Sequence, residues 1–142
     1  MKPNEAITPT GETLIRKVLL TNAVSSGIFG LLLLAFPGYV AEWTGLESRT
    51  ALVETAVFLL LFVAFLVWTV SRSMVPPSAV LVIAVIDILW VAGSVLLLGD
   101  KGTTGKMTVF GITVILLVAA VVGVFAIFEV LYYGRNRYFR RN

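Results

Sequence analysis

The chain has 142 residues, of which 58% are hydrophobic and 13% are charged, and its mean hydropathy is +0.98. A soluble domain of this length cannot bury so much apolar surface in one core, so the excess must face lipid or a partner. The chain has no Cys and no His, which excludes thiol nucleophiles, disulfides, axial His ligation of haem and the usual zinc and copper sites. We therefore expect an integral membrane protein without a metal site or a cofactor.

Four apolar segments follow one another, and each has the roughly 20 residues that a bilayer-crossing helix needs. They cover about residues 18–36, 51–70, 80–98 and 109–133 and precede a basic tail over 134–142. Pro37-Gly38 ends the first segment, Pro76-Pro77 follows the second, and Gly134 is expected to end the fourth. This order predicts an all-α fold: a single-domain, antiparallel, up-down bundle of four transmembrane helices.

The distribution of Lys and Arg predicts the orientation, because cytoplasmic loops carry an excess of both. The side that holds the two termini carries eight of them, namely Lys2, Arg16, Lys17, Arg72, Arg135, Arg137, Arg140 and Arg141. The opposite side carries three, namely Arg49, Lys101 and Lys106. We expect a multi-pass protein of a bacterial inner membrane, with its N- and C-termini in the cytoplasm.

Aromatic residues fit this orientation, because Trp and Tyr gather at membrane–water interfaces. Tyr39 and Trp43 are expected at the outer boundary, and a short helix over 39–46 is expected to lie flat there. The expected inner boundary holds Trp68, Tyr132, Tyr133 and Tyr138.

The first and third segments also show a weak internal repeat. At an offset of 65 positions Asn22 aligns with Asp87, and the leucines at 31–33 align with those at 96–98. Both segments run in the same direction across the membrane, so the repeat would consist of two tandem helical hairpins. The alternative is that leucine runs align by chance in any membrane protein.

Polar residues inside the apolar segments are the candidate functional residues. Asp87 lies about 10 Å inside the third segment at 1.5 Å per residue, and a carboxylate there must face the bundle interior, water or a partner group. Asn22, at a comparable depth, is a suitable hydrogen-bond partner for it. Two interpretations stay open: a structural contact between helices, or a proton or cation site.

Glu129 lies near the expected end of the fourth segment, on the side where Arg16 and Lys17 begin the first. An ion pair with these cations is its simplest role, and a catalytic role is the alternative. Glu54, near the opposite side, is expected to reach lipid headgroups or Arg49.

Small and polar residues mark the faces on which the helices are expected to pack, since they allow close approach and turn polar groups inward. These residues are Asn22, Ser26, Gly27 and Gly30 on the first helix, Asp87, Trp90 and Ser94 on the third, and Ala119, Gly123 and Ala126 on the fourth.

Three patterns carry a likeness to known sequences: Asp87-x-x-Trp90-x-x-x-Ser94, the closing motif Phe125-Ala-Ile-Phe-Glu129, and Asn22-x-x-x-Ser26-Gly27. They resemble the corresponding parts of a widespread bacterial family of small four-helix integral membrane proteins of unknown function. The resemblance covers about residues 14–137. It implies the four-helix fold and the topology, and it implies no activity.

The sequence favours a non-enzymatic protein, since it shows no nucleophile–base pair, metal site or phosphate loop. The first hypothesis is an accessory or oligomeric membrane component, whose partners are the lipid bilayer, a second copy or another membrane protein. The alternative is a transporter or channel component for a proton, an ion or a small solute that uses Asp87 and Asn22. The basic tail is expected to meet anionic headgroups and not nucleic acid.

Overall fold

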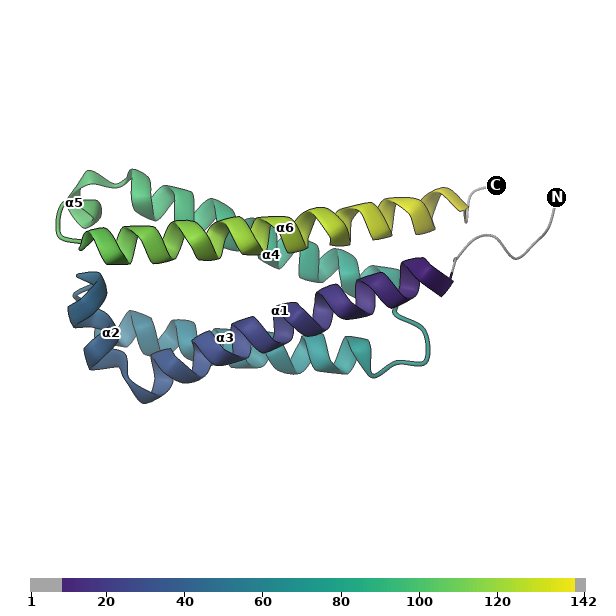
Figure 1. Ribbon diagram of the computed structural model, residues 1–142, viewed down its shortest axis with the longest axis horizontal. Helices are drawn as coiled ribbons and strands as arrows, with labels where there is room; N and C mark the ends of the chain where they lie inside the picture. The colour runs from purple at the N-terminus through teal and green to yellow at the C-terminus, as the bar shows by residue number, and fades with distance from the viewer. Residues whose placement is uncertain (1–8, 140–142) are drawn as a thin grey trace.

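The computed structural model of the chain describes residues 9–139, and their side chains over 11–137. Within this range all regular structure is helical, in the order α1 (Pro9–Ala35), α2 (Pro37–Thr44), α3 (Arg49–Val70), α4 (Pro77–Gly99), α5 (Lys101–Thr104) and α6 (Val109–Phe139). The helices α1, α3, α4 and α6 are long and apolar enough to cross a membrane (Figure 1). The prediction of an all-α four-helix membrane protein is therefore confirmed.

The long helices pair as two antiparallel hairpins. α1 packs along α3, α4 packs along α6, and the contact between the hairpins runs mainly through α1 and α6. Each hairpin has a short helix between its long ones, α2 in the first and α5 in the second (Figure 1). Both halves thus follow the order long helix, short helix, long helix, which is the arrangement that two tandem hairpins would give.

Two of the long helices extend beyond the spans expected from the sequence. α1 begins at Pro9 where the expected start was residue 18, and α6 continues through Gly134 to Phe139. The prediction that Gly134 ends the fourth helix is wrong, and much of the expected tail is helical. A single Gly costs a helix only about 1 kcal/mol, and beyond it the Asn136 amide donates to the Tyr132 carbonyl one turn back. Residues 140–142 lie outside the described range.

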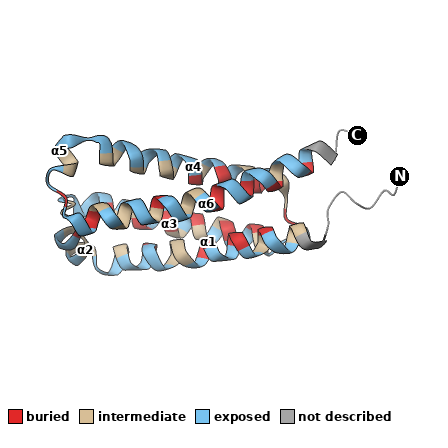
Figure 2. Cartoon of the chain, turned by 45° about the horizontal axis from the view of Figure 1, so that its top comes forward, coloured by how far each residue is buried: buried red, intermediate tan, exposed pale blue. Residues whose placement is uncertain are grey.

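Buried residues gather in the half of the bundle where α1 begins (Figure 2). In α4 they lie between Ala79 and Asp87, and the rest of that helix carries none. Leu89 and Leu96 on α4 are 65% and 75% exposed. Apolar side chains this exposed on a spanning helix face lipid, so this half of α4 is mostly membrane surface.

The short helix expected over 39–46 is confirmed as α2, which runs across the end of the bundle (Figure 1). Pro37 occupies its first turn, and Gly45 ends it with φ 76°, a conformation that favours glycine. The same end of the bundle also carries α5, whose Asp100 side chain accepts a hydrogen bond from the Thr103 N–H.

The end of α2 is clamped onto the start of α6. The Thr108 N–H donates to the Thr44 carbonyl at 3.0 Å, and the Thr108 hydroxyl donates to the Trp43 carbonyl. A Cβ added at Gly111 would lie only 2.3 Å from the Thr44 carbonyl oxygen, so the two backbones are in direct contact there. This clamp ties the first hairpin to the second at the α2 end.

Candidate functional site

One cluster of buried polar side chains lies where three of the long helices meet. Asn22 and Ser26 come from α1, Asp87 from α4 and Glu129 from α6. Asn22 and Glu129 are fully buried, and Asp87 is 2% exposed. Asp87 follows the start of α4 by ten residues and precedes its end by twelve, which is about 15 and 18 Å along the axis. Asp87 and Asn22 therefore lie near the middle of α4 and α1, and Glu129 lies about two-thirds of the way along α6.

The side-chain amide of Asn22 joins the two acids. Its Nδ2 donates to Asp87 Oδ2 at 2.6 Å and lies 3.5 Å from Glu129 Oε1. Its Oδ1 accepts a hydrogen bond from the Ser26 hydroxyl at 3.1 Å. Because Ser26 engages the oxygen side of the amide, the two N–H donors are left for the two carboxyl groups. The Asn22–Asp87 hydrogen bond expected from the sequence is confirmed.

Glu129 belongs to this cluster, and the prediction of an ion pair with Arg16 or Lys17 is wrong. Arg16 pairs with Glu12 at 2.6 Å, and the side chain of Lys17 is exposed. Since α6 continues to Phe139, Glu129 lies ten residues before the end of the helix, well inside the bundle. Its position on the buried face of α6, one turn after Phe125 and Ala126, turns it towards α1.

The two carboxyl groups contact the same nitrogen atom and therefore lie close to each other. Two negative charges this close in an apolar interior repel each other strongly and lack the water that would stabilise them. A proton held by the pair removes the repulsion and leaves one negative charge for the Asn22 amide to stabilise. Glu129 Oε2 has no hydrogen-bond partner among the described residues, so an acceptor position stays open on this acid.

The other predicted site residues lie outside the cluster. Ser94 donates to the Trp90 carbonyl of its own helix at 2.8 Å and is half-buried. The three predicted packing glycines lie inside the hairpins, with Gly27 against Val63 of α3, Gly30 against Leu59 and Leu60 of α3, and Gly123 against Val91 of α4. Ser26 alone among the predicted hydroxyls thus joins the polar cluster.

Arg16 caps the end of α3 in the half of the bundle where α1 begins. Its guanidinium donates to the carbonyls of Val70, Arg72 and Ser73, and Glu12 holds it in place. Glu12 Oε1 also accepts from the Val75 N–H at 3.4 Å. From the sequence, Arg16 was expected to indicate the orientation and to pair with Glu129; the i, i+4 spacing of Glu12 and Arg16 was the available hint of the ion pair that forms instead.

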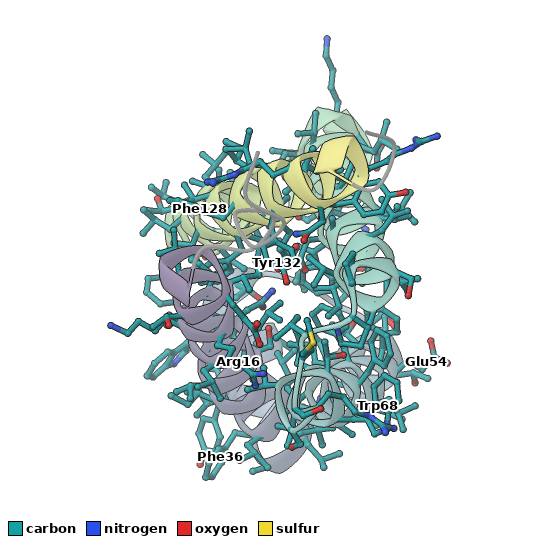
Figure 3. All side chains as sticks on the ribbon, turned by 90° about the vertical axis from the view of Figure 1, so that its right-hand side faces the viewer. Arg16, Phe36, Glu54, Trp68, Phe128 and Tyr132 are labelled. Carbon is teal, nitrogen blue, oxygen red and sulfur yellow. The ribbon has the colours of Figure 1, made fainter. Side chains whose placement is uncertain are left out.

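Tyr132 and Trp68, both expected at the inner membrane boundary, lie in different surroundings. Tyr132 is buried, points between the helices and donates from its hydroxyl to the Val75 carbonyl at 3.3 Å (Figure 3). Tyr132 therefore adds nothing to an exposed aromatic belt, and its level at the inner boundary stays a prediction. Trp68 lies on the outside of the bundle, where the Arg72 guanidinium is 4.2 Å from its ring centroid, as an interface residue would be (Figure 3).

Within the described range no three His, Cys, Asp or Glu side chains lie close enough together to hold a metal ion. Comparison with known proteins gave no match among family models, curated proteins or solved structures. The resemblance to the bacterial four-helix family therefore stays a prediction, and the functional argument depends on the geometry of the cluster.

Proposed function

We propose that the protein is a proton-binding component of a membrane transport system, in which Asp87 and Glu129 share the bound proton. The observation that carries this proposal is the pair of buried carboxyl groups that contact one amide nitrogen, inside a bundle of four helices that are apolar enough to span a membrane. Ionisable groups inside a membrane are costly, and in transport proteins they mark proton and ion pathways. From the sequence only one deep acid was expected; the second acid makes a proton relay chemically reasonable.

The orientation of Asn22 favours a proton over a metal cation as the bound species. Sodium and potassium ions are coordinated by oxygen atoms, so a bound cation would gain a further ligand if the amide oxygen faced the acids. Here the N–H side faces Asp87 and Glu129, while the oxygen accepts from Ser26. The cluster is therefore built to stabilise carboxylate charge by hydrogen bonding, which is what proton uptake and release require.

The second candidate is an accessory or oligomeric membrane component in which the cluster only ties the helices together. The observation in its favour is that Asn22 uses both its N–H side and its oxygen in contacts with other helices or with its own helix. Interhelical hydrogen bonds of this kind stabilise membrane bundles modestly. In either case we propose a non-enzymatic protein.

Location and assembly complete the proposal. We propose a bacterial inner membrane as the location, and the eight-to-three distribution of Lys and Arg supports cytoplasmic termini. Four helices enclose little space, so we propose that a transport pathway forms between two or more copies of the chain. The first residues of α1 and the last residues of α6 lie at the same end of the bundle (Figure 1).

Proton flux in liposomes tests the transport proposal. Liposomes with the purified protein and a pH-sensitive dye inside are exposed to an outward potassium gradient with valinomycin, which drives proton entry. We expect the parent protein to acidify the lumen and both Asp87→Asn and Glu129→Gln to abolish this entry. Glu54→Gln, at an exposed acid on the surface of α3, is the matched control and should behave as the parent. A parent protein that is silent, or active variants of both acids, would contradict the proposal and leave the cluster as a structural contact.

A further inference from the structure

A hollow of about 320 Å³ lies at the α2 end of the first hairpin, away from the polar cluster. It is lined by the last residue of α1, by Phe36 after it, by four residues of α2 and by the first residue of α3. Its two charged members are Glu42 and Arg49. No residue that lines it belongs to the polar cluster.

Glu42 and Arg49 do not pair with each other. The ion pairs of the described residues are Glu12–Arg16 and Glu47–Lys106, which leaves both charged groups of the hollow without a charged partner there. The Arg49 guanidinium lies over Gly38, where an added Cβ would be 3.5 Å from its Cζ. Because Arg49 and Glu42 line the same hollow without pairing, they can bind a ligand that carries both a negative and a positive group.

The position of the hollow identifies the kind of ligand. The first apolar span ends at Ala35 and the second begins at Arg49, so the hollow lies where spanning helices leave the bilayer. Phe36 and Tyr39 line it as well, with their rings edge to face, and are 51% and 65% exposed. Exposed leucines of α1, including Leu31 and Leu34, continue from it along the membrane-facing surface. A lipid could therefore place its headgroup in the hollow and its acyl chains against α1.

We propose that this hollow binds the headgroup of a zwitterionic phospholipid that carries a primary ammonium group, such as phosphatidylethanolamine. Arg49 binds the phosphate, because a guanidinium matches phosphate oxygens with two parallel N–H donors. Glu42 accepts from the ammonium. A choline headgroup keeps its positive charge but has no N–H to donate to Glu42, and a glycerol headgroup has no positive charge, so both interact with Glu42 more weakly.

Lipid retention by the purified, full-length protein tests this proposal. The protein is equilibrated in detergent with equal amounts of phosphatidylethanolamine, phosphatidylcholine and phosphatidylglycerol, and the bound lipids are identified by native mass spectrometry. We expect the parent to retain phosphatidylethanolamine preferentially. Arg49→Gln should lower this retention about tenfold, in line with the loss of a charge-assisted contact. Glu42→Gln should keep lipid binding but remove the preference for the ammonium headgroup.

Lys101→Gln is the matched control, because Lys101 is an exposed cation at the same end of the bundle that belongs to no ion pair among the described residues. It should retain lipid as the parent does. Equal retention by Arg49→Gln and the parent, equal losses in Arg49→Gln and Lys101→Gln, or a parent without headgroup preference would overturn the proposal. Displacement of the lipid by an equal concentration of glycerophosphoethanolamine, which has no acyl chains, would show a site for free phosphate esters and would also overturn it.

Discussion

Nδ2 of Asn22 donates a hydrogen bond to Oδ2 of Asp87 at 2.6 Å, across a sequence separation of 65 residues. The first and third apolar spans also align at an offset of 65 positions, which makes Asn22 and Asp87 equivalent in the internal repeat. The two residues that correspond in the repeat therefore contact each other where the two hairpins meet. Glu129, from the second hairpin, contacts the same amide. A movement of one hairpin relative to the other would change the hydrogen bonding of the two acids, which is how a bundle of this kind could couple proton binding to a change of shape.

The cap on α3 predicts different effects for two neighbouring cations of α1. Arg16→Gln removes charge-assisted hydrogen bonds to three carbonyls of the α3 end and its loop, and should lower the free energy of unfolding by about 1–3 kcal/mol. Lys17→Gln removes the same charge from an exposed position and should change it by less than about 0.5 kcal/mol. Thermal unfolding in detergent measures both. If both substitutions lowered the free energy of unfolding equally, the loss of a positive charge, and not the loss of the cap on α3, would be the cause.

Close contact between α2 and α6 predicts that Gly111 tolerates no side chain. In Gly111→Ala the new methyl group would lie 2.3 Å from the Thr44 carbonyl oxygen, so the clamp must open, at a cost of about 1–3 kcal/mol. Gly134→Ala, in the same helix but with no atom within 4 Å of the new Cβ, should be neutral or stabilising, since Ala favours a helix. Unchanged stability of Gly111→Ala in the same thermal assay would show that the two helices are not clamped.

Gly30 is predicted to set the distance between α1 and α3. A Cβ at this position would lie 3.2 Å from Leu60 Cδ2 and 3.3 Å from Leu59 Cβ, so Gly30→Leu should force the helices apart and cost about 1–3 kcal/mol. Gly93→Leu, on the exposed surface of α4, meets no atom within 4 Å and is the control. The apparent melting temperature of each variant in detergent gives the comparison. If Gly30→Leu and Gly93→Leu have the same apparent melting temperature, Gly30 faces lipid.

The sequence predicts the spans well because length and hydropathy alone decide which segments can cross a bilayer. It also predicts the Asn22–Asp87 contact, because both residues are polar and lie at similar depth in their apolar segments. Glu129 was misplaced because the polar residues after Gly134 resemble a tail, whereas the helix continues through them. The depth of Glu129 could be predicted from the sequence only if the end of α6 were predicted correctly.

Contacts between distant segments account for the other misses. The Arg16 cap joins residues more than 50 positions apart, and the contact of Gly111 with Thr44 joins positions 67 apart. Many glycines of the chain have free space around them, so composition does not identify the two whose backbone is in contact with another segment. These features follow from how the hairpins pack, and no local pattern carries that information.

Orientation in the membrane is tested by reporter fusions. A reporter active only in the cytoplasm should work when fused after Asn142 or inserted at 72–78, and should be silent when inserted at 100–106, because eight of the eleven Lys and Arg residues lie on the side of the termini. Activity at 100–106 together with silence at the C-terminus would reverse the orientation.

The central claim is that Asp87 and Glu129 hold a proton between them inside the membrane. The most direct measurement is the infrared spectrum of the protein in lipid bilayers at neutral pH, where a protonated carboxyl group gives a C=O band distinct from that of a carboxylate. We expect the parent protein to show this band, the double variant Asp87→Asn/Glu129→Gln to lose it, and Glu54→Gln, at an exposed acid, to keep it. A parent spectrum without a protonated carboxyl band at neutral pH, or a band that survives in the folded double variant, would contradict the claim.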